Sequence, residues 1–240
     1  MEFQAAVAKV SKYSVRDSGD SVEVTERPHG GLSLVLADGQ RSGRSAKLIS
    51  NIVARKAASL LGEGVRDGAV ARAAHDYLRT HRSGQVSADL IILSLDLVSR
   101  TLVVSRNGPP VLLWLPVEGG KVLDGLCEPV GIHAGTKPVI VEVPLEVGLR
   151  AVAFSDGLLD AGVRRGAHQS TAQWLDLVRQ HASCGAEELA DLLLARAIEL
   201  DEERPQDDIT VLVAGVYSRQ DAVAARRLTL RVPVDLVAGG

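Results

Sequence analysis

An α+β fold built from layers of sheet and helix is predicted for this chain of 240 residues. Strand-like segments come first and two helical segments follow; more strands, two further helical segments and one last strand complete the order. Apolar residues make up 46% of the sequence, which is enough for a substantial core. No Pro/Gly/Ser-rich linker and no internal repeat divides the chain. We therefore expect one domain over residues 1–216 and a C-terminal extension over residues 217–240.

The first half is expected to contain three strands and a helix pair. The strands are predicted at residues 5–13, 21–26 and 32–37, because these segments are apolar or alternating and turn residues separate them. Apolar residues then recur with helical spacing over residues 48–61 and 67–80, which predicts two helices.

The second half is expected to return to strands and end with another helix pair. Strands are predicted at residues 88–96, 101–106, 111–117, 137–143, 149–155 and 209–216, the first two joined as a hairpin. One helix begins near Ser170, where Gln173 completes a capping box, and another covers residues 186–202 before Pro205. In the extension, alternating apolar residues over 228–232 suggest an extra strand, or a segment that covers a sheet edge.

Charge and composition exclude several classes of protein. The formal net charge is −3, so no electrostatic reason exists to expect nucleic-acid or anionic-membrane binding. Cys127 and Cys184 are too few for a disulfide framework and fit a reducing cytoplasm. No apolar run approaches the ~20 residues that span a bilayer, and the N-terminus lacks a secretory signal pattern. The sequence therefore predicts a cytoplasmic protein that binds neither nucleic acid nor membrane.

Four short acidic motifs stand where predicted strands meet loops. They are Ser18-Gly19-Asp20, Asp38-Gly39, Ser155-Asp156-Gly157 and Asp207-Asp208-Ile209-Thr210. Carboxylates at the ends of buried strands gather along one rim, where their repulsion forces either protonation or the binding of a cation. A set of oxygen ligands suits hard ions such as Mg²⁺ or Mn²⁺. The motifs therefore predict a metal-dependent enzyme, although Asp-Gly by itself is a common turn dipeptide.

The order and spacing of these motifs resemble the metal-dependent serine/threonine protein phosphatases of type 2C. The likeness runs from about Ala6 to about Val216 and is closest to the bacterial branch of the sporulation stage II and stressosome phosphatases. It implies a four-layer α-β-β-α sandwich with two central, mainly antiparallel sheets. It also implies a hydrolase that removes phosphate from phosphoserine or phosphothreonine, with two Mn²⁺ or Mg²⁺ ions as cofactors.

The resemblance also assigns roles to individual residues. Asp38 would be the catalytic ligand that bridges the two ions, with the Gly39 carbonyl assisting one of them. Asp156, which would also be catalytic, and Asp207 would be the remaining ligands of the other ion. A water shared by two such ions has a lowered pKa and attacks the phosphoryl group without a covalent phosphoenzyme.

Two further acids have less direct roles by this resemblance. Asp20 would reach the ions directly or through water. Asp208 stands where relatives often have Asn, and would orient the loop.

Two departures from the family pattern stand out. The bacterial pattern Asp-Gly-x-Gly-x-Gly reads here with Arg41 in place of a small residue. Arg41 could supply a guanidinium that binds substrate phosphate, point to solvent, or hinder substrate. Ser18 stands where Gly is frequent. Neither change removes a carboxylate, so we expect an active enzyme.

The expected partner is a phosphorylated signalling protein, such as a stressosome scaffold or an anti-sigma-factor antagonist, which would place the chain in a bacterial stress response. The main alternative is a pseudophosphatase that binds phosphoproteins or acts as a scaffold without turnover. A two-metal nuclease is a weaker alternative, because the charge is acidic and aromatic residues are sparse. In some relatives the helices after the Asp-Gly motif act as a switch; here, core packing explains their apolar faces equally well.

Overall fold

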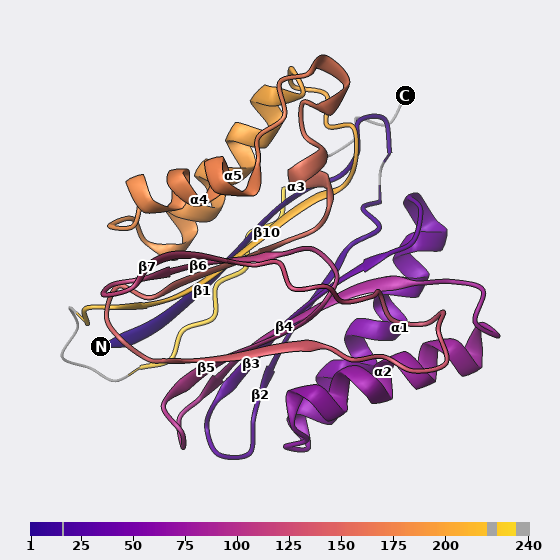
Figure 1. Cartoon of the computed structure of the whole chain (residues 1–240), viewed down its shortest axis with the longest axis horizontal. Helices are drawn as coiled ribbons and strands as arrows, with labels where there is room; N and C mark the ends of the chain where they lie inside the picture. The colour runs from indigo at the N-terminus through magenta and orange to yellow at the C-terminus, as the bar shows by residue number, and fades with distance from the viewer. Residues whose placement is uncertain (16, 220–224, 234–240) are drawn as a thin grey trace.

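Two antiparallel sheets pack face to face, and a pair of helices covers the outer face of each sheet (Figure 1). The computed structural model describes residues 1–15, 17–219 and 225–233. Within these residues each sheet has five strands, and every pairing between neighbouring strands is antiparallel. The predicted α+β sandwich of four layers is confirmed.

The first sheet, called sheet A, contains both the first and the last strand of the fold. Its order is β1 (Glu2–Val10), β10 (Ile209–Tyr217), β9 (Arg150–Phe154), β6 (Val111–Leu115) and β7 (Gly119–Leu123). Helices α4 (Thr171–Gln180) and α5 (Ala186–Leu200) pack on its outer face. Trp174 and Phe154 are fully buried in the core between these helices and the sheet.

The second sheet, called sheet B, carries the strand that ends at the Asp-Gly motif. Its order is β2 (Ser21–Glu26), β3 (Leu32–Gly39), β4 (Ala88–Asp96), β5 (Thr101–Asn107) and β8 (Val139–Pro144). Helices α1 (Gly43–Gly62) and α2 (Asp67–His81) cover it. The central strands β3 and β4 are apolar along nearly their whole length because one face meets these helices and the other meets sheet A.

Several local predictions agree with the structure. Strands β4 and β5 form a hairpin in which Asp96 pairs with Thr101. Ser170 accepts a hydrogen bond from the backbone N–H of Gln173 and forms the predicted capping box at α4. Helix α5 ends at Leu200, before Pro205.

Other local predictions were wrong. The first strand was expected at residues 5–13 but spans Glu2–Val10, since all nine residues pair with β10. No strand was predicted between residues 117 and 137, yet Gly119 and Gly120 begin β7 and pair with Leu115 and Trp114. Two short helices had not been predicted, α3 (Gly157–Asp160) and η1 (Val163–Arg165).

The C-terminal extension is only partly described. Residues 225–233 form neither helix nor strand, so the strand expected at 228–232 is not formed there, while residues 220–224 and 234–240 lie outside the described part. The extension still contacts the domain: Arg226 donates to the Gly30 carbonyl at 2.7 Å, and Arg231 pairs with Glu187 at 2.6 Å. The division into a domain and an extension stays a prediction.

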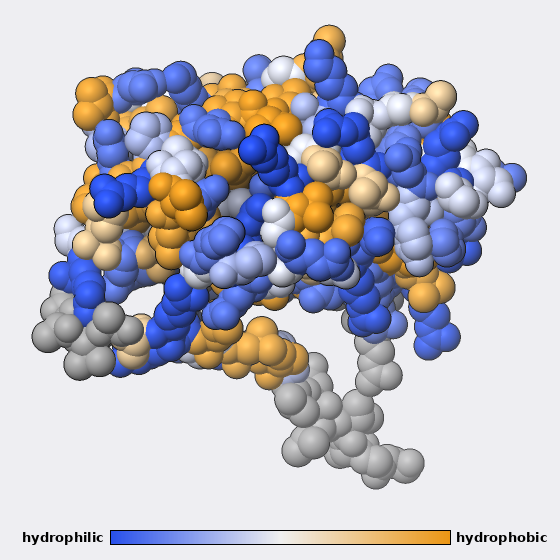
Figure 2. All heavy atoms as spheres, turned by 90° about the horizontal axis from the view of Figure 1, so that it is seen from below, coloured by the Kyte–Doolittle hydropathy of each residue, from blue (hydrophilic) through white to orange (hydrophobic). Residues whose placement is uncertain are grey.

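The outer surface is mixed in polarity. Apolar areas alternate with hydrophilic ones on the face drawn in Figure 2. Leu48 on α1 and Ile140 on β8 are among the exposed apolar side chains. None of the helices within the described residues is both long enough and apolar enough to cross a bilayer.

Candidate metal centre

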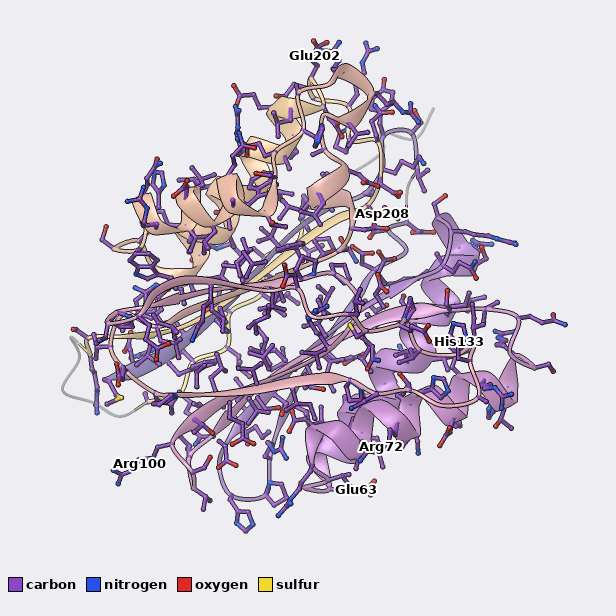
Figure 3. The ribbon with its side chains drawn as sticks, in the orientation of Figure 1. Glu63, Arg72, Arg100, His133, Glu202 and Asp208 are labelled. Carbon is purple, nitrogen blue, oxygen red and sulfur yellow. The ribbon has the colours of Figure 1, made fainter. Side chains whose placement is uncertain are left out.

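Five acidic residues come together at one edge of the sandwich. Asp38 lies at the end of β3 and pairs in register with Asp89 at the start of β4. Asp156 follows β9, Asp207 precedes β10, and Asp20 precedes β2. Because neighbouring strands are antiparallel, the end of one strand lies beside the start of the next, and residues far apart in sequence share one edge. Asp208, labelled in Figure 3, marks this edge on sheet A.

Asp20 is the most deeply buried of these acids. It is 0% exposed, and Thr210 donates its hydroxyl to Asp20 Oδ2 at 2.5 Å. Asp20 Oδ1 is buried and has no hydrogen-bond partner among the described residues. Burial raises the pKa of Asp20, and the hydrogen bond from Thr210 opposes that rise. An unpartnered buried oxygen of this kind is costly unless a proton or a cation reaches it.

Asp38 stands at the centre of the cluster. The side chains of Asp20 and Asp156 lie near that of Asp38, and the three carboxyl groups influence one another's ionisation. Burial, followed by the charges of Asp20, Asp156 and Asp89, raises the pKa of Asp38 to about 10. Without a cation, Asp38 therefore holds a proton at neutral pH.

Asp89 was missed by the sequence analysis. Burial raises its pKa to about 7, and the charges of Asp156 and Asp20 contribute. Asp89 belongs to no Asp-Gly motif, because it is the second residue of the apolar strand β4. The sequence did offer one signal for Asp89: it is an acidic residue at the start of an apolar strand, and that strand is the next one in the chain after the strand that ends at Asp38.

Asp156 and Asp207 form the more open side of the cluster. Burial, Asp207 and Asp160 raise the pKa of Asp156 to about 6. Asp156 is exposed as a whole residue, so solvent screens its interactions more than those of Asp38. Asp207 is half-buried, and its Oδ1 accepts from the backbone N–H of Asp208 at 2.9 Å.

Asp208 fixes the loop that carries Asp20. Its two carboxylate oxygens accept from the backbone N–H groups of Lys12 at 2.9 Å and Gly19 at 2.8 Å. The side chain is buried, so both bonds are shielded from water. The loop-orienting role that the resemblance implied for Asp208 stays a prediction, and these two hydrogen bonds are the contacts through which it would act.

The glycines of two motifs allow backbones to approach closely. A Cβ atom on Gly39 would lie 2.1 Å from the Ala46 carbonyl oxygen of α1. A Cβ atom on Gly157 would lie 2.2 Å from the Asp208 carbonyl oxygen. Any larger residue would therefore push Asp38 away from α1, or Asp156 away from the start of β10.

Arg41 lies in the loop between β3 and α1, with its side chain exposed. Its φ of 77° falls in the left-handed region, which glycine adopts without strain. A residue with a Cβ atom is strained at this φ, so Arg41 carries backbone strain. The neighbouring Gln40 anchors the loop, because its backbone N–H donates to the Ser87 carbonyl at 3.0 Å.

The chemistry of the cluster fits a divalent cation. Its donors are carboxylate oxygens, the pKa values of four of the acids are raised, and Asp20 Oδ1 lacks a partner among the described residues. Among those same residues, however, no three His, Cys, Asp or Glu side chains converge closely enough to hold a metal as they stand. Ion binding therefore requires these side chains to move toward a common centre.

The histidines and cysteines stay outside the cluster. His133 is exposed and lies 3.3 Å from Glu128, and His29 is exposed on the loop between β2 and β3. Cys127 and Cys184 are both free and partly exposed.

Comparisons with known proteins agree with this architecture. The family model described as stage II sporulation protein E matches residues 28–217. No curated protein matches the chain.

Solved structures share the fold at low sequence identity. The phosphatase domain of SpoIIE from Bacillus subtilis, with a fragment of its regulatory domain, gives a TM-score of 0.76 at 20% identity. That match covers 90% of this chain but 64% of the other, so this chain spans less than two thirds of that structure. The PP2C domain of SiaA from Pseudomonas aeruginosa gives 0.74 at 21% identity, with coverage of 89% and 85%. The catalytic domain of PstP, in complex with two manganese ions, gives 0.67 at 17% identity, with coverage of 90% and 99%.

Proposed function

The chain belongs to the family of stage II sporulation protein E, and on that premise we propose that it is a metal-dependent serine/threonine protein phosphatase. The observation that carries the proposal is the gathering of Asp20, Asp38, Asp156 and Asp207 from both sheets at one edge. Three of these acids have raised pKa values, which is what a site built for added positive charge shows before a cation arrives.

The carboxylates would hold two divalent ions, Mn²⁺ or Mg²⁺. Asp38 is suited to bridge them because its carboxyl group lies among those of Asp20, Asp156 and Asp89, whose charges raise its pKa. Asp207 and the Gly39 carbonyl would complete the set. Bound ions would lower the pKa of water and offset the charge on phosphoryl oxygens during in-line attack.

The remaining residues of the site hold it in place or meet the substrate. Asp208 fixes the Asp20 loop through Gly19 and Lys12, which limits the motion of the most buried carboxylate. Arg41 projects from the loop next to Asp38, and its planar guanidinium can bind two oxygens of a phosphoryl group. The strained backbone of Arg41 is consistent with a side chain retained for binding rather than for folding.

The proposed substrate is a bacterial signalling protein that carries phosphoserine or phosphothreonine. Structures with this fold include one described under the bacterial stressosome and one of the RsbU and RsbW domains of Rv1364c from Mycobacterium tuberculosis. Their settings support a role in signalling, of the stressosome or anti-sigma-factor antagonist type. The pseudophosphatase alternative gains no support, because every carboxylate that the family resemblance requires is present at the edge.

Phosphate release from a phosphothreonine peptide tests the proposal. Wild-type protein is expected to release phosphate with Mn²⁺, to stop when a chelator is added, and to lose activity on Asp156→Asn. Asp191→Asn is the matched control, because Asp191 is exposed on α5 and belongs to no acidic motif. Loss of activity in both variants, or activity that survives chelation, would contradict the proposed site.

A further inference from the structure

Two lysines from different layers meet at one backbone carbonyl beside the carboxylate cluster. Lys9 Nζ, from β1 of sheet A, donates to the Asp20 carbonyl at 2.6 Å. Lys47 Nζ, from α1 above sheet B, donates to the same oxygen at 2.5 Å and to Ser21 Oγ at 3.1 Å. Two ammonium groups thus lie close together where the two halves of the sandwich meet.

Neither lysine forms an ion pair with an Asp or Glu side chain within the described residues. An ammonium group has three N–H donors. The contacts with described residues use one donor of Lys9 and two of Lys47. Lys9 is exposed and Lys47 is half-buried, so an acceptor can arrive from solvent. Both ammonium groups therefore keep N–H donors for a further acceptor.

The surroundings of the two lysines suit an anion with several oxygens. Two like charges near one another repel, and an anion placed between them would relieve the repulsion and accept hydrogen bonds from both. Ser21 Oγ also hydrogen-bonds to Ser50 Oγ at 2.7 Å and to Asn51 Oδ1 at 2.8 Å. These bonds fix the position of the hydroxyl group that accepts from Lys47. The hydrogen bonds to the Asp20 carbonyl and to Ser21 therefore give the Lys9 and Lys47 ammonium groups a defined position.

We propose that Lys9 and Lys47 form an oxyanion-binding subsite next to the metal centre. Its ligand is the phosphoryl group of the substrate or a carboxylate that flanks the phosphorylated residue. The assignment to a substrate rests on the proposed phosphatase function, whereas the binding of an oxyanion by the lysines does not. The competing explanation is that the lysines only offset the negative charges of Asp20 and Asp208, which predicts no anion binding.

A titration with inorganic phosphate tests the subsite without relying on activity. The protein is kept in chelator, and binding is followed by calorimetry and by the rise in Tm. Lys9→Gln and Lys47→Gln are each expected to weaken phosphate binding roughly tenfold, while Lys47→Arg keeps the charge and the binding. Lys137→Gln removes an exposed lysine before β8 and serves as the control with the same change in charge. The subsite is ruled out if wild type binds no phosphate, or if the double variant Lys9→Gln/Lys47→Gln binds it as tightly as wild type.

Kinetics with Mn²⁺ distinguishes the two sources of the oxyanion. The substrates are p-nitrophenyl phosphate and two phosphothreonine peptides, one with Asp and one with Ala beside the phosphorylated residue. If the subsite holds the phosphoryl group, Lys47→Gln raises KM for all three substrates; if it holds a flanking carboxylate, only the acidic peptide is affected. Unchanged KM with a lower kcat on every substrate would show a purely structural role and overturn the proposal. Phosphate binding that depends on the lysines in a protein that hydrolyses none of these substrates would refute the phosphatase but not the subsite.

Discussion

Replacing Asp38 by Asn should stabilise the metal-free protein at neutral pH, even though it is expected to abolish activity. The pKa of Asp38 is raised from 3.8 to about 10 by burial and by Asp20, Asp156 and Asp89. The folded protein therefore keeps the Asp38 proton at pH 7, while the unfolded chain releases it. Because the folded state binds more protons, its stability falls as pH rises above about 4.

The size of the effect follows from the shift. At pH 7, about three pH units above its ordinary pKa of 3.8, ionisation of Asp38 stabilises the unfolded chain by about 4 kcal/mol. The folded protein does not gain this free energy, because Asp38 stays protonated in it. Asn at this position avoids that cost because it is neutral in both states. Its side-chain N–H groups can donate to the neighbouring carboxyl groups of Asp20 and Asp156 in place of the Asp38 proton. Allowing for imperfect replacement of these bonds, we expect a gain of about 2 to 4 kcal/mol.

Urea denaturation in chelator at pH 7 and at pH 4 measures this effect. The variant should be more stable than wild type at pH 7 and within about 0.5 kcal/mol of it at pH 4, where Asp38 is protonated in the folded state and only about half ionised in the unfolded chain. With Mn²⁺ present the order should reverse, because only wild type gains stability from the bound ions. Equal stabilisation at both pH values, or none at pH 7, would refute the argument that burial among carboxylates raises the pKa of Asp38.

Three further substitutions test other parts of the structure. Asp89→Asn should weaken Mn²⁺ binding roughly tenfold in calorimetry, because it removes a neighbour of Asp38 at the cluster; unchanged affinity would place Asp89 outside the metal centre. Asp67→Ala should cost about 3 kcal/mol in urea denaturation, because it leaves the largely buried Arg27 side chain, which is 14% exposed and lies 2.9 Å from the Asp67 carboxylate, without that partner; a loss below about 1 kcal/mol would contradict this. Arg41→Gly should raise Tm, since glycine adopts a φ of 77° without strain worth about 1 kcal/mol, and should raise KM for a phosphopeptide. An unchanged KM would remove Arg41 from substrate binding.

The sequence predicted the fold from signals that act over short distances. The apolar strands β3, β4 and β10 and the helices α1 and α2 were recognisable because each carries its own hydrophobic periodicity. The capping box at Ser170 and the hairpin between β4 and β5 were equally local. Errors arose where pairing with a neighbouring strand, rather than the local sequence, determines whether a segment is a strand. Gly119 and Gly120 join β7 because β6 supplies hydrogen bonds to them, and no local pattern marks that pairing.

Some residues of the candidate site were likewise recognisable from local motifs, and one was not. The Asp-Gly motifs identified Asp20, Asp38, Asp156 and Asp207, whose roles as ligands stay predictions. Asp89 carried no motif, and only the pairing of β3 with β4 places it beside Asp38.

The amino-acid sequence by itself determined which segments become strands and helices, and which acids stand at their ends. The tertiary structure alone decided which of these acids influence one another's ionisation, that Asp208 holds the Asp20 loop, and that Lys9 and Lys47 reach the same carbonyl. The physical reason is that periodicity and turn chemistry are encoded within a few residues. Burial, electrostatic shifts and shared contacts depend instead on strand register and layer packing, which join residues nearly two hundred positions apart, as Gly19 and Asp208 are joined.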